Sequence, residues 1–223
     1  MTDPVDVSKL DPATLAKHLA KPEGPIGIAV TAGLNKTNAR PYSVAIEKLR
    51  LQQDEKILEV GFGNGNEVGR LIDCATGIKY TGIDYSQTMV AEALTRNAAA
   101  IGAGSVVITH GTSDDLPFES AYFDAALALN TIYFWPHPEI DLREIRRVLK
   151  LGGRLAIGAL SPWSAKERPV FQHGFAFYDL PELAALLSRA GFASTESEMI
   201  KDETTTPDGK KLIRDYFVVL AQA

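Results

Sequence analysis

The sequence predicts an α/β fold built on a doubly wound, mostly parallel sheet, and three observations carry that prediction. Apolar runs of strand length alternate with helix-forming segments from residue 54 onward. One of these strands passes through closely spaced glycines directly into a helix. The last two strands follow each other with no helix between them, which indicates an antiparallel hairpin at the end of the sheet.

The N-terminal part, residues 1–53, is expected to be a helical extension that precedes the main domain of residues 54–223. Asp11 is placed to cap a first helix with Pro12 at its first position, and the Pro- and Gly-containing stretch 21–25 ends that helix. The apolar residues between Val44 and Leu51 predict one further helix within 26–53, leading into the first strand.

Strands in the main domain are expected at 55–60, 79–84, 105–110, 122–130, 154–160, 194–200 and 214–221. Residues 122–130 are almost wholly apolar, as a central parallel strand should be. Helices are expected at about 66–75, after the N-cap Ser86, at 138–150 and at 179–190. Gly152 and Gly153 are interpreted as the C-cap of the third of these, and 201–213 as a polar loop.

Composition limits the classes of protein to consider. A chain of 223 residues suffices for one α/β domain with a full core, and its net charge of −5 lacks the basic footprint of a general nucleic-acid binder. The single cysteine, Cys74, is expected to be buried and rules out an internal disulfide, and no metal site is expected. No signal peptide and no apolar stretch of membrane-spanning length is recognised, so a cytoplasmic location is expected.

The glycine turn is the strongest functional signal. Residues 59–65 read E-x-G-x-G-x-G between a strand and a helix, whereas dinucleotide-binding turns read G-x-G-x-x-G, and the third glycine of that pattern is here Asn66. A second strand ends on Asp84, about 20 residues after the glycines, where an acid can accept both ribose hydroxyls. These features predict a nucleotide-cofactor site of another type than the dinucleotide one.

Four further segments lie in the order and spacing of a known family: residues 115–118, Phe123 with Asp124, residues 147–155 and residues 181–192. Together with the glycine turn and Asp84, they resemble the class I S-adenosylmethionine-dependent methyltransferases of the UbiE-like, methyltransferase-domain-11 type. The resemblance covers roughly residues 54–195. It implies a Rossmann-like, seven-stranded sheet with helices on both faces and an antiparallel C-terminal strand, with S-adenosylmethionine as the cofactor.

The resemblance also implies residue roles. The three glycines would wrap the methionyl part of the cofactor, with Glu59 beneath the turn. Phe62, inside the glycine turn, either packs in the core or forms a wall of the cofactor cleft. Asp84 would hold the ribose, and Tyr85 would pack on the adenine. Many relatives carry an aspartate in the loop after the third strand for the adenine amino group, and here this acid is missing. The expected cofactor-binding residues are therefore Glu59, Gly61, Phe62, Gly63, Gly65, Asp84, Tyr85, Thr112, Ser113, Asp114 and Asn130.

The acceptor side is less defined. Aromatic residues follow the fourth strand and recur through 161–178, which is interpreted as a substrate-side insertion, so the acceptor is expected to be a small aromatic or apolar molecule. The resemblance implies that residues 1–53 fold over the cofactor as a lid. Tyr133 and His173 are the candidate catalytic residues, with His173 as the hypothetical general base where the acceptor carries a proton.

Other classes stay open at this point. An NAD-dependent oxidoreductase shares the glycine turn and the ribose acid, but Asn66 disfavours it. A domain that binds the cofactor without catalysis, or serves as a partner subunit, is a second alternative. A nucleic-acid methyltransferase is disfavoured by the acidic charge and by the Asn130–Tyr133 sequence, which lacks the Pro-Pro-aromatic motif of that class. The acceptor atom and the oligomeric state are not predicted.

Overall fold

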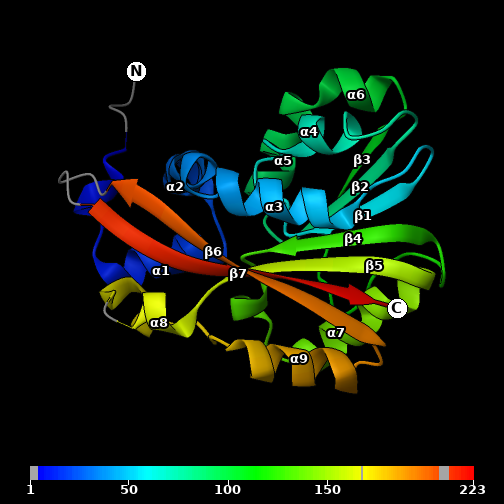
Figure 1. Cartoon of the computed structure of the whole chain (residues 1–223). Coiled ribbons are helices and arrows are strands. Elements are labelled where there is room, and N and C mark those ends of the chain that lie inside the picture. Colours follow the sequence, from blue (N-terminus) through cyan, green and yellow to red (C-terminus); the bar gives the residue numbers. More distant parts are fainter. Residues whose placement is uncertain (1–4, 167, 206–210) are drawn as a thin grey trace.

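The computed structural model describes residues 5–166, 168–205 and 211–223. Its centre is a seven-stranded sheet of order β3-β2-β1-β4-β5-β7-β6 (Figure 1). The strands β1 to β5 pair in parallel, whereas β7 is antiparallel to both of its neighbours. The strands are Lys56–Val60, Lys79–Asp84, Val106–His110, Phe123–Leu129, Leu149–Leu160, Ser194–Thr205 and Lys211–Gln222. The predicted fold class is confirmed.

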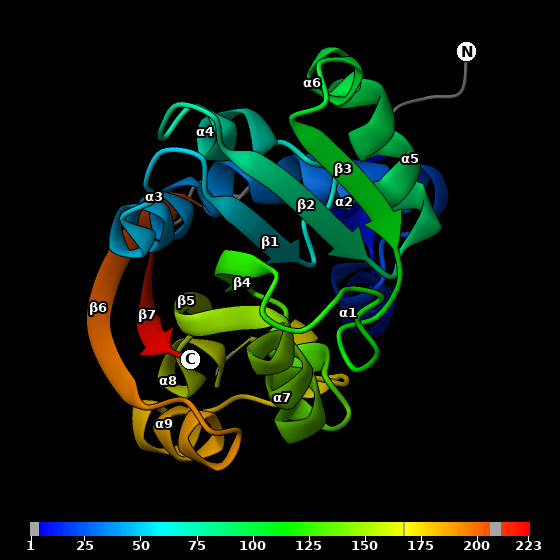
Figure 2. The same ribbon diagram turned by 90° about the vertical axis from the view of Figure 1, so that its right-hand side faces the viewer.

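Helices cover both faces of this sheet. Figure 2 shows α7 and α9 on one face, and α3, α4 and α5 on the other. Ser86 caps α5 through a bond from the Met89 N–H, and Asp179 with Glu182 forms a capping box on α9. The helices of the main domain are α4 (Val68–Ile72), α5 (Gln87–Arg96), α6 (Ala98–Gly102), α7 (Pro138–Val148), α8 (Pro162–Ala165) and α9 (Leu180–Arg189).

The N-terminal extension holds α1 (Pro12–Ala20), α2 (Gly24–Thr37) and α3 (Ala39–Leu49). The helix predicted from the apolar residues after Val44 is α3, whereas α2 was not predicted. Asp11 caps α1 as expected. The break between α2 and α3 has a local cause, because Pro41 has no N–H to offer the Thr37 carbonyl. That carbonyl instead accepts a bond from the Arg214 guanidinium at 2.6 Å, which ties the break to β7.

The end of α7 differs from its prediction. The helix stops at Val148, and Leu149 is already extended and paired with Phe123. Gly152 therefore caps no helix: it turns within β5 at φ 77° and donates its N–H to the Ala223 carbonyl. The last two strands also take up most of the loop expected at 201–213, of which residues 206–210 lie outside the described residues.

The single cysteine and the apolar character of the helices can be compared with their predictions. Cys74, expected in the core, is exposed, because it follows the C-terminal end of the short helix α4. In the described part of the chain, no helix combines the length and apolar character that crossing a membrane requires. The core itself lies between the sheet and its helices, with Leu58, Leu127 and Ile157 fully buried in adjacent strands.

Candidate functional site

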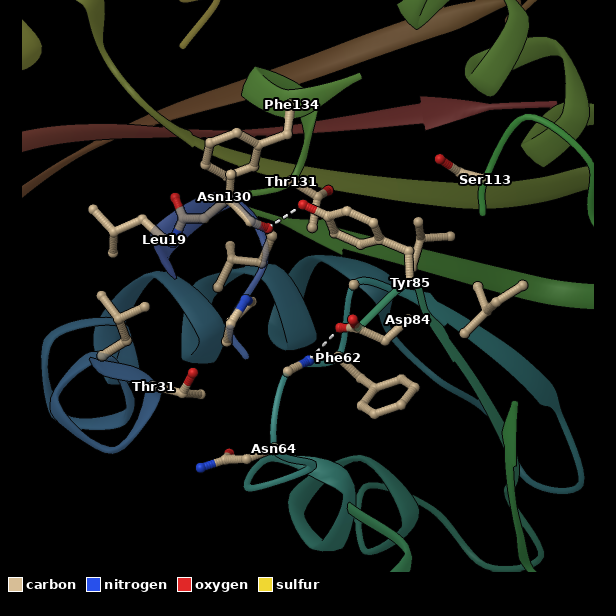
Figure 3. A pocket seen from close by; sticks show the side chains of 18 of the residues that line it. Leu19, Thr31, Phe62, Asn64, Asp84, Tyr85, Ser113, Asn130, Thr131 and Phe134 are labelled. Atoms are coloured by element: carbon tan, nitrogen blue, oxygen red, sulfur yellow. Dashed lines mark hydrogen bonds between the residues drawn. The ribbon is translucent and has the colours of Figure 1, made fainter. Parts of the chain in front are cut away.

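A cavity of about 330 Å³ lies at the carboxyl ends of β1, β2, β3 and β4, where open α/β sheets bind ligands. Figure 3 shows side chains from the N-terminal helices, the glycine turn and the segment after β4 around one space. Of the sequence-predicted cofactor residues, nine line this cavity: Gly61, Phe62, Gly63, Asp84, Tyr85, Thr112, Ser113, Asp114 and Asn130. Glu59 and Gly65 do not, and neither do the two candidate catalytic residues.

The glycine turn needs glycine for conformation and for space. Gly61, Gly63 and Gly65 all have positive φ, between 61° and 75°. A Cβ on Gly61 would lie 2.2 Å from the Thr131 Cγ2, and a Cβ on Gly65 would lie 2.8 Å from that of Ala93. Gly65 thus allows close packing against α5, whereas Gly61 and Gly63 present their backbone to the cavity.

Asp84 links the glycine turn to the end of β2. One carboxylate oxygen accepts the Gly63 N–H at 2.9 Å, and the other accepts the Ser86 N–H at 2.8 Å. The residue is only 6% exposed, and burial raises its pKa to about 6 although the two N–H groups oppose that rise. A buried carboxylate held in this way is pre-positioned for a ligand's hydroxyl groups or positive charge.

Glu59 lies behind the cavity wall and is held by two tyrosines. Its carboxylate accepts hydrogen bonds from the hydroxyls of Tyr42 and Tyr80, the latter at 2.7 Å. Burial raises the pKa of Glu59 to about 7. Tyr42 belongs to α3 and lines the cavity, so Glu59 connects the N-terminal helices to β1 and β2. Sequence reasoning placed Tyr42 in the lid region but gave no sign of this bond.

The N-terminal helices form one side of the cavity. They contribute Leu19, Ala20, Pro22, Thr31, Leu34, Asn35, Asn38 and Tyr42. Three hydrogen bonds fasten the α1–α2 connection to the end of β2 and the start of α5. The Tyr85 hydroxyl donates to the Ala20 carbonyl, Ser86 Oγ donates to the Pro22 carbonyl, and the Gly24 N–H donates to Thr88 Oγ1. No local motif identifies Leu19 or Thr31 as site residues.

The loop after β3 brings in an acid that sequence reasoning missed. Thr112 and Asp114 are exposed, whereas Ser113 is buried and donates its hydroxyl to Asp141 Oδ1. Asp141 lies in the first turn of α7 and also lines the cavity. It is 3% exposed, and burial raises its pKa. Its other oxygen, Oδ2, has no hydrogen-bond partner among the described residues.

The segment after β4 forms the opposite wall. Asn130 has a φ of 57°, and its side-chain oxygen accepts the Tyr133 hydroxyl at 3.0 Å. Tyr133 also accepts the Leu160 N–H and is buried outside the cavity lining, so burial raises its pKa well above the ordinary value. Phe134 and Trp135, next in the chain, do line the cavity.

Aromatic side chains of the 161–178 segment pack against this wall. Phe175 lies with its ring centroid 4.7 Å from that of Phe134, and Phe177 lies 5.0 Å from Tyr133. The segment contains α8 and a short 3-10 helix, Pro169–Gln172. His173 follows that helix, is exposed and does not line the cavity.

The charge of the cavity wall has one sign. Four carboxylates line it, those of Glu67, Asp84, Asp114 and Asp141, and within the described ranges no Lys, Arg or His does. Glu67 is paired with Arg70, which lies outside the lining, at 2.7 Å, so the other three carry most of the negative charge. Such a wall favours a cationic ligand and opposes a polyphosphate.

Comparisons with known proteins agree with this geometry. Residues 58–157 match the methyltransferase-domain-11 family, described as "Methyltransferase domain". A 27-O-demethylrifamycin SV methyltransferase from Amycolatopsis mediterranei is 30% identical over 183 residues, covering 78% of this chain and 67% of that protein. The ubiquinone/menaquinone biosynthesis C-methyltransferase UbiE of Geotalea daltonii is 32% identical over 154 residues, covering 65% of this chain but only 62% of that protein.

Among solved structures, the complex between the Haloferax volcanii Trm112 methyltransferase activator and a methyltransferase contains a chain of the same fold. It aligns with a TM-score of 0.74 at 20% identity, covering 86% of this chain and 92% of that one.

Proposed function

This chain belongs to the class I S-adenosylmethionine-dependent methyltransferases of the UbiE-like type, and from that premise we propose that it methylates a small, uncharged acceptor of aromatic or apolar character. The acceptor atom is left open, because the names of the relatives include both O- and C-methyltransferases.

The observation that carries this proposal is the acidic cavity wall. S-adenosylmethionine carries a sulfonium and an ammonium against one carboxylate, so the Asp84 carboxylate in the cavity wall stabilises it. Glu67 contributes less, because its carboxylate already pairs with Arg70 at 2.7 Å. The pyrophosphate of a dinucleotide would be repelled by the same carboxylates, and no basic side chain of the described lining would offset that repulsion. An acceptor that is itself a carboxylate or phosphate is disfavoured for the same reason.

We assign the cofactor's parts to this wall as follows. The turn at Gly61 and Gly63 takes the methionyl part, Asp84 the ribose, and Tyr85 with the loop 112–114 the base. Phe62 and Asn130 close the sides, Gly65 allows the turn to pack on α5, and Glu59 supports the wall from behind through Tyr42. Residues 1–53 then act as the lid, 54–223 as the methyltransferase domain, and 161–178 as an insertion beside the acceptor.

The bound cofactor supplies a methyl group on a leaving group that is already activated. The protein's own task is to orient the acceptor in line with that methyl group and to exclude water. Phe134 and Trp135 line the cavity, and aromatic rings there would stabilise positive charge near the transfer. Tyr133 fixes Asn130 through its hydrogen bond, and we therefore assign it a positioning role at the active site.

A general base is needed only where the acceptor atom carries a proton at neutral pH. The Tyr133 hydroxyl donates a hydrogen bond to Asn130 and accepts one from the Leu160 N–H. Because both bonds are made within the protein, we do not assign Tyr133 as the base. His173 is the remaining candidate from sequence, and its exposed position makes the test simple. If His173→Ala leaves kcat/KM unchanged, His173 is not the base.

The direct test is turnover. The purified protein is incubated with methyl-labelled S-adenosylmethionine and sets of phenols, hydroquinones, amines and their carboxylated analogues. We expect labelled product and S-adenosylhomocysteine with an uncharged aromatic or apolar acceptor. Turnover confined to anionic acceptors would contradict the proposed substrate class. Tight cofactor binding with no turnover across the set would favour a binding or partner subunit.

A further inference from the structure

One buried carboxylate oxygen in the cavity wall lacks a partner. Asp141 is 3% exposed, and Ser113 holds its Oδ1, but Oδ2 receives no hydrogen bond from any described residue. An unpaired buried carboxylate oxygen costs free energy, so such groups need an explanation. Because Asp141 lines the cavity, a ligand donor is the explanation that this position offers.

The position of Asp141 indicates which part of a ligand it meets. Asp84 contacts the glycine turn on one side, through the Gly63 N–H. On the other side its backbone carbonyl accepts the Gly111 N–H at 3.1 Å, where the loop that carries Ser113 begins. A cofactor whose ribose lies at Asp84 and whose methionyl part lies at the glycines must direct its base toward that loop.

We propose that Asp141, reaching in from the first turn of α7, is the residue that selects adenine by accepting a hydrogen bond from its exocyclic amino group. This inference rests on the proposed function. The amino group is a donor, and an ionised carboxylate is an acceptor only. Ser113 then serves to fix the carboxylate by donating to its other oxygen.

Asp114 is the rival in the same loop, since it also carries a carboxylate and lines the cavity. Its side chain is exposed, so water satisfies it whether or not a ligand is bound. A hydrogen bond to Asp114 therefore gains little over solvent, whereas Asp141 gains a partner that solvent does not supply. Discrimination between bases is strongest where an unmatched base leaves a buried group unpaired.

The test compares calorimetric titrations of S-adenosylhomocysteine and S-inosylhomocysteine, which differ in that the second carries a carbonyl in place of the amino group. We expect the wild-type protein to bind the adenosyl compound at least about tenfold more tightly. In Asp141→Ala that ratio should fall toward one, through loss of adenosyl affinity. Asp141→Asn, which keeps the shape of the side chain, should also lower the ratio, because a neutral amide is a weaker acceptor.

Asp115→Ala is the matched control, because it removes an equal charge from the same loop at a residue outside the cavity lining. It should keep the wild-type ratio. The assignment would be overturned if both Asp141 variants kept the wild-type ratio of the two affinities, or if Asp114→Ala lowered that ratio instead. If the wild-type protein binds neither compound nor S-adenosylmethionine, the proposed function fails instead. Equal weakening of both compounds in the Asp141 variants would mean a structural role only.

Discussion

At the scale of single residues, the ionisation of Asp84 should govern cofactor affinity. Its pKa of about 6 means that the carboxylate loses its charge as the pH falls from 7 to 5. A cationic ligand binds the ionised form better, so the Kd for S-adenosylmethionine should rise about tenfold over that range. Titration calorimetry at several pH values measures this change.

Asp84→Asn should bind S-adenosylmethionine more weakly at pH 7, and its Kd should change little with pH. The control variant Asp115→Asn should show the same change of Kd with pH as the wild-type protein. If the Kd of Asp84→Asn changes with pH as much as that of the wild-type protein, the group whose ionisation controls binding is not Asp84.

The raised pKa of Glu59 predicts how the stability of the folded protein changes with pH. Its pKa is about 7 in the folded protein, against 4.5 for a free glutamate side chain, so between these pH values the folded state binds more protons than the unfolded state. The free energy of unfolding therefore falls as the pH rises through that window, by on the order of 3 kcal/mol from this group. Urea unfolding of the unliganded protein at pH 5 and pH 8 tests it.

In Glu59→Gln this part of the pH dependence should disappear, because the amide does not titrate, while Glu119→Gln at the exposed surface should leave it intact. The prediction fails if Glu59→Gln and wild type lose equal stability between the two pH values.

Sequence could identify residues whose role is encoded locally. The glycines at 61, 63 and 65 and the strand-ending Asp84 belong to short patterns, and the structure brings them together at one turn. Asp141 could not be found in this way, because it reaches the site only through the packing of its helix. Tyr42 was placed in the lid region, but its bond to Glu59 has no local signal. The exposed position of His173 was equally invisible, since a loop has no periodicity that reports its orientation.

At the scale of elements, the glycine turn depends on both its backbone conformation and its close contact with the segment after β4. Gly61→Ala should destabilise the protein by more than the roughly 1–3 kcal/mol expected from positive φ alone, because the new Cβ would lie 2.2 Å from the Thr131 Cγ2. Denaturant unfolding measures the loss. Adding Thr131→Ser, which removes that methyl group, should restore part of it.

Gly104→Ala is the matched control for the Gly61 experiment. Its φ of 72° is similar, but a Cβ there would meet no atom within 4 Å, so it reports backbone strain without a clash. Equal losses at the two glycines would show that the contact with Thr131 contributes nothing.

The lid role of α1 and α2 is testable by hydrogen exchange. Both helices line the cavity, and the hydrogen bonds at Ala20, Pro22 and Gly24 fasten their connection beside Asp84. Adding S-adenosylmethionine should slow amide exchange in α1 and α2, while α9, remote from the cavity lining, should stay unchanged. Tyr85→Phe should speed exchange near Ala20 in the unliganded protein. No slowing on cofactor addition would argue against a lid.

Element prediction worked where the signal was an apolar run or a cap and failed where tertiary contacts decided the boundary. Asp11 and Ser86 cap their helices as the sequence indicates. The end of α7 did not follow Gly152, because Leu149 gains a strand partner in Phe123. Helix α2 was not predicted, because the apolar residues that indicated a helix begin only at Val44, and the contact that ends α2, from the Arg214 guanidinium to the Thr37 carbonyl, is a tertiary one.

At the scale of the whole molecule, the sheet order places the carboxyl ends of β1, β2, β3 and β4 side by side (Figures 1 and 2). Residues of the N-terminal helices complete the cavity at that edge. The alternation of strands and helices was sufficient to predict a doubly wound, mostly parallel sheet, whereas the lid over the cavity was expected only from the family resemblance. The acidic sign of the cavity wall was not predictable, because its four carboxylates come from four separate segments of the chain.

The central claim is that this acidic cavity binds S-adenosylmethionine, and calorimetric titration with that compound and with NAD tests it most directly. We predict micromolar binding of S-adenosylmethionine, at least about tenfold weaker in Asp84→Ala, and no measurable binding of NAD. Binding of NAD without binding of S-adenosylmethionine would contradict the account.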